Sequence, residues 1–124
     1  MTYAEIETGV RNLVQDNVPE YRLSALDAYG YTNAGIRTLF RLRPAAFFVD
    51  GRMPASEAAA EPVDAATVAA AAGAVDVKAP AGDRYLEALI YYVAGRYLER
   101  NDADSLNTEL AQSYLQKFAE MARM

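Results

Sequence analysis

The distribution of aromatic residues divides this chain into two parts that can build a hydrophobic core and one part that cannot. Aromatic side chains occur as far as Phe48 and resume at Tyr85, with none between them. The stretch from Ala55 to Gly82 has 13 alanines among its 28 residues, and its large apolar residues are four valines. Burying so few large side chains stabilises a fold far less than ordering that much backbone costs in entropy. We therefore expect this insertion to be mobile in the free subunit or ordered by packing against something else.

The first part of the chain begins with the signals of a helix. Thr2 and Glu5 have the T-x-x-E spacing of a capping box, and apolar residues then recur at helical intervals. Pro19 cannot continue a helix and also constrains the residue before it. The pattern predicts a helix that ends in the stretch before Pro19.

A second helix follows, with a second capping signal. Ser24 and Asp27 open it, and Pro44 closes it after a short basic run. Its apolar face is interrupted by two polar residues, Asn33 and Arg37. We therefore expect that this face does not belong entirely to the core.

The last part of the chain predicts two more helices joined by a polar turn at 101–104. Asp83 can cap the third helix, which is apolar on most sides and is therefore expected to be central. Gly95 inside it lowers helix propensity, so we expect a neighbouring backbone to approach there. Asp102, Asp104 or Ser105 can cap the fourth helix. Its apolar stripe consists of Leu106, Leu110, Tyr114, Phe118 and Met121. The short turn makes these two helices antiparallel neighbours.

The two ends of the insertion have the local pattern of short strands. The run 47–49 leads into Asp50 and Gly51, a hairpin turn signal, and the run 75–78 alternates with period two. The alanine-rich run 65–72 is alternatively compatible with a helix. The fold class predicted from all these signals is mainly α. We expect a four-helix bundle within a single domain, 1–124, with an alanine-rich loop or β-hairpin inserted at about 47–82 between helices two and three.

The composition argues against an enzyme. The chain contains no Cys and no His, which removes thiolate ligands, the commonest metal ligand and the usual general base. The acidic run at 101–105 with Glu109 fails the EF-hand pattern, because Leu106 falls where an oxygen ligand is required. We therefore expect no catalytic residues, no metal and no cofactor. No run is long enough to span a membrane, and the N-terminal residues lack the pattern of a signal peptide, which predicts synthesis in the cytoplasm.

Charge and tyrosine content point to contacts with other proteins. The net charge of -5 argues against a protein that grips nucleic acid through its phosphates. The basic cluster at the end of helix two either complements the helix dipole, pairs with an acidic neighbour or, less favourably, contacts phosphate. Tyrosine is enriched at interfaces. Tyr97 and Tyr114 fit the core stripe, whereas four others are expected to be semi-exposed: Tyr3, Tyr21, Tyr31 and Tyr92.

Two stretches resemble the head-to-tail adaptor (connector, or neck) proteins of tailed bacteriophages. One is the capped helix pair that ends in Arg41-Leu42-Arg43-Pro44. The other runs from Lys78-Ala79-Pro80-Ala81-Gly82-Asp83-Arg84-Tyr85 into Leu86-Glu87-Ala88-Leu89-Ile90-Tyr91-Tyr92-Val93, followed by a polar turn and a last helix with Tyr114 and Phe118. The resemblance covers nearly the whole chain, and each motif is short and degenerate. The chain ends soon after Phe118, whereas some relatives carry a C-terminal tail that reaches into the portal.

This resemblance implies a structural protein of the virion neck. Such a subunit forms a homo-oligomeric ring of twelve copies between the portal protein and a tail or nozzle protein. Double-stranded DNA passes through the ring without specific binding, and an acidic lumen suits that passage. The expected interface residues are Arg37, Arg41, Arg43, Phe47, Phe48, Arg52, Tyr92, Met121 and Met124. The alternative function is a soluble helical interaction module, such as a regulator or antitoxin-like partner, without catalytic activity.

Overall fold

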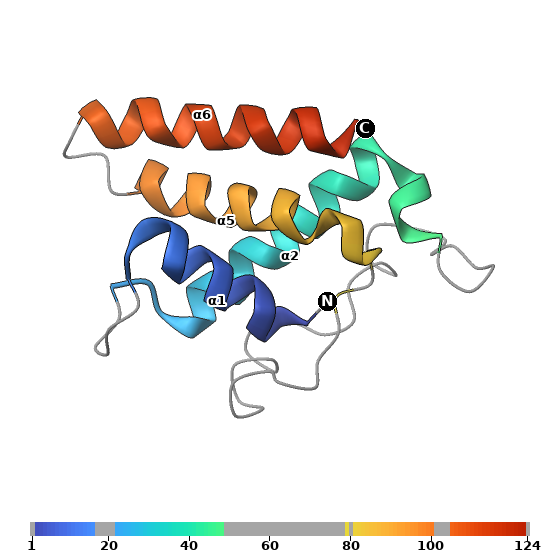
Figure 1. The fold of residues 1–124 in the computed structure, drawn as a ribbon, viewed down its shortest axis with the longest axis horizontal. Coiled ribbons are helices and arrows are strands. Elements are labelled where there is room, and N and C mark those ends of the chain that lie inside the picture. Colours follow the sequence, from blue (N-terminus) through green and yellow to red (C-terminus); the bar gives the residue numbers. More distant parts are fainter. Residues whose placement is uncertain (1, 17–21, 49–78, 80, 101–104, 124) are drawn as a thin grey trace.

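The chain folds mainly into α-helices, as the sequence predicts. The computed structural model describes residues 2–16, 22–48, 79, 81–100 and 105–123. Within these ranges lie four α-helices, α1 (Tyr3–Val14), α2 (Ala25–Leu42), α5 (Leu86–Arg100) and α6 (Ser105–Ala122), and two short 3-10 helices, η1 (Pro44–Phe47) and η2 (Asp83–Tyr85). Figure 1 shows the four helices packed side by side as a bundle. The predicted insertion falls almost entirely on residues 49–78, outside the described part of the chain.

Both predicted capping signals are confirmed. The backbone N–H of Glu5 donates to the Thr2 hydroxyl over 3.1 Å, and the backbone N–H of Asp27 donates to the Ser24 hydroxyl over 3.1 Å. Each bond satisfies a backbone donor that the first helical turn leaves without an intrahelical partner. Helix α1 ends at Val14, and Gln15 follows in the left-handed conformation with φ 59°.

Helix α5 is the centre of the bundle, which confirms the expectation for the third helix. It packs against α1, α2 and α6. Because neighbours surround it, residues on several of its sides are buried, among them Ala88, Leu89, Val93 and Ala94. In Figure 1, α6 runs antiparallel to α5 and covers it on one side, while α1 and α2 lie on the other.

Helices α5 and α6 approach closely at Gly95. A Cβ atom at this position would lie 3.2 Å from the backbone oxygen of Ala111 and 2.8 Å from Cγ of Leu115. The expected role of Gly95 in admitting a neighbouring backbone is therefore confirmed. Between these two helices the rings of Tyr92 on α5 and Phe118 on α6 pack edge to face, with centroids 4.9 Å apart.

Two local predictions were wrong where 3-10 turns replace the expected structure. Phe47 belongs to η1 and does not begin a strand, because Pro44 at the first helical position favours a new helical turn directly after α2. The predicted strand at 75–78 lies outside the described residues. Asp83 does not stand directly before α5: it is the first residue of η2, whose N-cap is Gly82, and this 3-10 turn precedes the helix.

Several exposure predictions were also wrong. Tyr3 and Tyr92 are buried, not semi-exposed, and Tyr21 lies outside the described residues. Asn33 is also buried. Tyr3 packs edge to face on the ring of Tyr29 and donates a hydrogen bond to the side-chain oxygen of Asn33, so the polar residue has a partner inside the protein. Leu110, placed in the apolar stripe of the fourth helix, is 38% exposed. Tyr97 is buried, as predicted for the core stripe, whereas Tyr114 is only half-buried. Tyr31 is half-buried, as predicted.

Candidate protein-interaction surface

A buried polar cluster joins the end of α1 to the start of α2. The Arg11 guanidinium donates to the Leu23 carbonyl over 2.9 Å, to Asp16 over 3.2 Å and to Glu7 over 2.7 Å. Asp16 also accepts from the backbone N–H groups of Arg22 and Leu23 over 3.0 and 2.9 Å. These bonds all lie within the chain, so the cluster holds the two helices together.

The titration of this cluster fits a structural role. Burial raises the pKa of Asp16, but the two backbone donors and the neighbouring arginines outweigh it and hold the pKa below its ordinary value of 3.8. Burial and the nearby Glu7 carboxylate raise the pKa of Tyr29 far above that of a free phenol. At neutral pH Asp16 is therefore ionised and Tyr29 is protonated, and neither group titrates near that pH.

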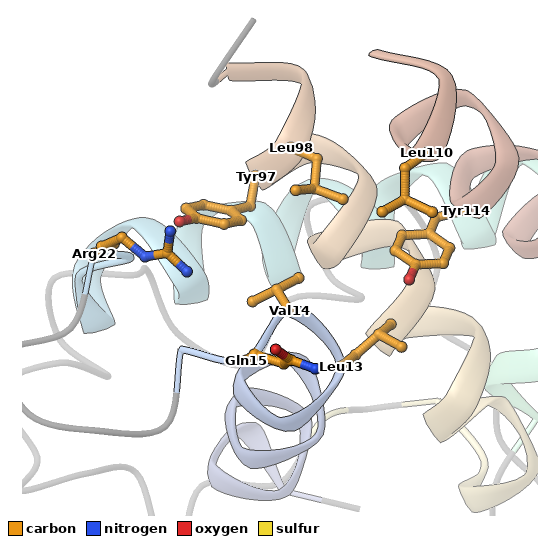
Figure 2. Close-up of a pocket in the computed structure, with 8 residues that line it drawn as sticks. All are labelled: Leu13, Val14, Gln15, Arg22, Tyr97, Leu98, Leu110 and Tyr114. Carbon is orange, nitrogen blue, oxygen red and sulfur yellow. The ribbon is translucent and has the colours of Figure 1, made fainter. Parts of the chain in front are cut away.

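A cavity of about 330 Å³ lies where the ends of α1 and α5 meet α6 (Figure 2). Its walls are Leu13, Val14, Leu98 and Leu110 with the rings of Tyr97 and Tyr114, and the polar side chains of Gln15 and Arg22 complete the lining. Arg22 is the charged member of this set. Among the described residues that line the cavity there is no carboxylate, and the carboxylate near Arg22 is that of Asp16, whose Oδ1 lies 3.8 Å from the Arg22 Nε.

A shallower groove of about 570 Å³ runs between α1 and α5. Leu86, Ile90 and Gly9 form its apolar part, and Glu5 is its charged residue. Within the described residues no three acidic side chains lie close enough to hold a metal ion. No helix in the described ranges is long and apolar enough to cross a membrane.

Some of the predicted interface residues lie near the end of the bundle where α2 and α6 finish. The C-terminal ends of α2 and α6 meet there, because the Arg43 guanidinium donates from Nη1 to the carbonyl oxygen of Arg123 over 2.8 Å. Figure 1 shows the end of α6, marked C, beside the end of α2. We call the group formed by Arg41, Leu42, Arg43, Phe48 and Arg123 the basic–aromatic surface.

Phe48 follows the η1 turn, which the buried residue Phe47 anchors to the core. Phe47 is 1% exposed and packs edge to face on Phe40, with ring centroids 5.3 Å apart. The backbone N–H of Phe48 donates to the Ala45 carbonyl over 3.2 Å. Phe48 itself is 61% exposed. A large aromatic side chain is thus displayed to solvent by a short helix anchored in the core.

The arginines of the surface have more than one role. The bond from Arg43 to the Arg123 carbonyl caps the C-terminus of α6, whereas the helix-dipole interpretation concerned the end of α2 itself. The Nε atom of the same guanidinium is buried without a hydrogen-bond partner. Arg41 and Arg123 are exposed. The cluster therefore satisfies one helix end and still presents positive charge to solvent.

The structure brings together only part of the predicted set. Arg41, Arg43 and Phe48 belong to the basic–aromatic surface, and Arg37 and Met121 are half-buried. Phe47 and Tyr92 are inside the subunit, at 1% and 6% exposure, and cannot meet a partner in this conformation. Arg52 and Met124 lie outside the described residues. Sequence reasoning missed Leu42 and Arg123, because no local pattern signals a contact between helix ends 80 residues apart.

Comparison with protein-family models, with curated proteins and with solved structures finds no match for this chain.

Proposed function

We propose that the chain is a structural subunit of a phage virion, a head-to-tail adaptor that forms a ring between the portal and the tail. In this role twelve copies surround the channel through which DNA passes, and the subunit performs no catalysis. It is made in the bacterial cytoplasm and ends in the neck of the particle. The net charge of -5 is compatible with DNA sliding past without being held.

The residues that carry the resemblance to adaptor proteins support this proposal through their packing. The Asp83–Tyr85 turn leads directly into α5, the central helix. The tyrosines of α5 then pack on the aromatic residues of α6: Tyr91 lies 5.5 Å from Tyr114, centroid to centroid, and Tyr92 lies 4.9 Å from Phe118. The motif residues thus define the core helix pair of the subunit.

The observation that carries the proposal furthest is the exposure of Phe48, which is 61% exposed at the end of the η1 turn that follows Arg41 and Arg43 in the chain. Exposed aromatic residues on rigid supports, flanked by arginine, are typical of protein–protein contacts. In an assembly a neighbouring protein would cover this side chain and gain its apolar area. This feature favours a docking protein over a free-standing one.

The stoichiometry of purified particles tests the proposal. Quantitative mass spectrometry of virions, normalised to the portal protein, should find this chain at one copy per portal subunit. A regulator or antitoxin-like module acts in the infected cell and would be lost during purification. Absence of the chain from intact particles would exclude the proposed role.

A further inference from the structure

We infer that the cavity between the ends of α1, α5 and α6 binds a small carboxylic acid with an apolar body. Its carboxylate pairs with Arg22 and with the Tyr97 hydroxyl, and its hydrocarbon part lies against the aliphatic walls. The volume of about 330 Å³ is within the range of small-molecule sites in proteins. This inference goes beyond the proposed function, because it concerns a ligand of the single subunit and not its contacts in the particle.

The hydroxyl of Tyr97 is a polar group that the described part of the subunit does not use. Tyr97 is 4% exposed and lines the cavity (Figure 2), and no described residue forms a hydrogen bond with its hydroxyl. The oxygen is not sealed in the core, because the described side-chain atom that is both sealed and without a partner is Nε of Arg43. Buried polar groups in proteins nearly always have a hydrogen-bond partner. A hydroxyl left without one on a cavity wall therefore fits a group that binds a ligand.

Arg22 supplies the positive charge of the cavity. Its Nε lies 3.8 Å from Oδ1 of Asp16, which is beyond hydrogen-bond reach, and no described residue bonds to its two terminal nitrogens. Asp16 already accepts hydrogen bonds from Arg11 and from two backbone N–H groups. A guanidinium can hold both oxygens of a carboxylate with its paired N–H groups. The terminal nitrogens of Arg22 are therefore available to an anion in the cavity.

Gln15 adds an amide to the same lining. It follows α1 in the left-handed conformation, with φ 59°, which glycine or asparagine adopts more readily at a helix end. A glycine at this position would end the helix equally well and would leave the cavity wall without a polar side chain. The glutamine instead places there an amide that can donate to a carboxylate.

The rest of the lining suits a hydrocarbon. Four aliphatic side chains and the ring of Tyr114 form the walls, and Leu110 among them is 38% exposed, so a ligand would cover apolar area that is otherwise open. The groove between α1 and α5 has a larger volume, about 570 Å³, but its charged residue is Glu5, which repels an anion. The cavity is therefore the better site for a carboxylate.

Isothermal titration calorimetry of the intact chain with octanoate tests the inference. Octanamide keeps the hydrocarbon and lacks the charge, whereas acetate keeps the charge and lacks the hydrocarbon. Each should bind at least about tenfold more weakly than octanoate. Arg22→Gln should weaken octanoate binding about tenfold or more, and Tyr97→Phe should weaken it about fivefold, because each removes a donor to the carboxylate.

Two matched controls make the same chemical changes away from the cavity. Arg123→Gln removes an exposed guanidinium after the end of α6, and Tyr85→Phe removes a hydroxyl from the buried tyrosine that precedes α5. Neither should change the affinity for octanoate by more than about twofold, because neither residue lines the cavity. The unfolding midpoints of Arg22→Gln and Tyr97→Phe should stay within about 3 °C of wild type, because the groups that they remove have no hydrogen-bond partner among the described residues.

Three results would overturn the inference. The first is the absence of octanoate binding by wild type up to about 10 mM, a concentration above which binding is too weak to indicate a site. The second is equal affinity for octanoate and for either octanamide or acetate, which would remove the charge or the hydrocarbon from the assignment. The third is a lowered unfolding midpoint for Tyr97→Phe with unchanged affinity for octanoate, which would show that the hydroxyl supports the fold and not a ligand.

Discussion

Tyr3 donates a hydrogen bond from its phenol to the side-chain oxygen of Asn33, and both residues are buried between α1 and α2. The two positions are 30 residues apart, so this bond ties the first turn of the first helix to the middle of the second. It gives the buried amide of Asn33 a hydrogen-bond partner inside the protein.

Tyr3→Phe should destabilise the subunit by about 1–2 kcal/mol, because it removes a donor from a buried acceptor while keeping the ring. Urea unfolding followed by circular dichroism measures the change. Tyr114→Phe is the matched control: Tyr114 is half-buried, its ring packs on Tyr91, and the same loss of a hydroxyl there should change the free energy of unfolding by less than about 0.5 kcal/mol. Equal effects of the two substitutions would show that the bond to Asn33 contributes nothing.

Asp16 should make the subunit sensitive to acid. Its folded-state pKa is depressed, so its ionised form contributes stability that is fully present above the unfolded-state value of about 3.9 and is lost as the pH falls through the folded-state pKa. Asp16→Asn should lower the free energy of unfolding by about 2–3 kcal/mol at neutral pH, since the bonds to Arg11 and to two backbone donors lose their charge. The difference from wild type should shrink in acid.

Asp27→Asn is the control for the Asp16→Asn variant. It pairs with Arg100 over 2.7 Å, but both side chains are more than two-fifths exposed. Asp27→Asn should therefore cost less than about 1 kcal/mol. A pH profile of unfolding in which Asp16→Asn and Asp27→Asn behave alike would contradict the assignment of Asp16 as the ionised centre of the cluster.

Gly95→Ala should destabilise the α5–α6 pair although alanine is the better helix former. Its Cβ would meet Leu115 at 2.8 Å and the Ala111 oxygen at 3.2 Å, and overpacking of this kind costs about 1–3 kcal/mol. In a Leu115→Ala background the same change should cost clearly less, because the nearer obstacle is gone. A double-mutant cycle by thermal unfolding measures this coupling, and strict additivity would mean that the helices do not meet here.

The adjacent residues Phe47 and Phe48 should contribute very differently to the free energy of unfolding. Phe47→Ala should cost about 3–5 kcal/mol of stability, since Phe47 is buried against Phe40. Phe48→Ala should leave the free energy of unfolding within about 0.5 kcal/mol of wild type, because its side chain is 61% exposed. Chemical denaturation measures the free energy of unfolding of the two variants. A large loss of stability in Phe48→Ala would show that Phe48 supports the fold and is not displayed for a partner.

Much of the helical frame could be predicted from the sequence, because its signals are local. The two capping residues, Thr2 and Ser24, and the terminating Pro44 each act within a few positions and place the helix ends. The apolar character of the third helix identified it as central for a similar reason: a helix that is apolar on most sides has to be surrounded.

The errors come from contacts between distant segments. Tyr92 looked semi-exposed because it falls off the main stripe of its own helix, and only Phe118 on α6 explains why it is covered. Tyr3 is buried for the same kind of reason, through Asn33. The basic–aromatic surface was predicted in part from its arginines, but its second helix end, at Arg123, became visible only in three dimensions.

Imaging of the chain together with its portal tests the central claim most directly. The portal protein encoded in the same genome is mixed with this chain and the product is examined by electron cryomicroscopy. The account predicts a closed ring of this subunit seated on the portal. Monomeric behaviour of the chain alone would leave that prediction intact, because assembly can require the partner. Bare portals in the presence of excess folded chain would contradict it.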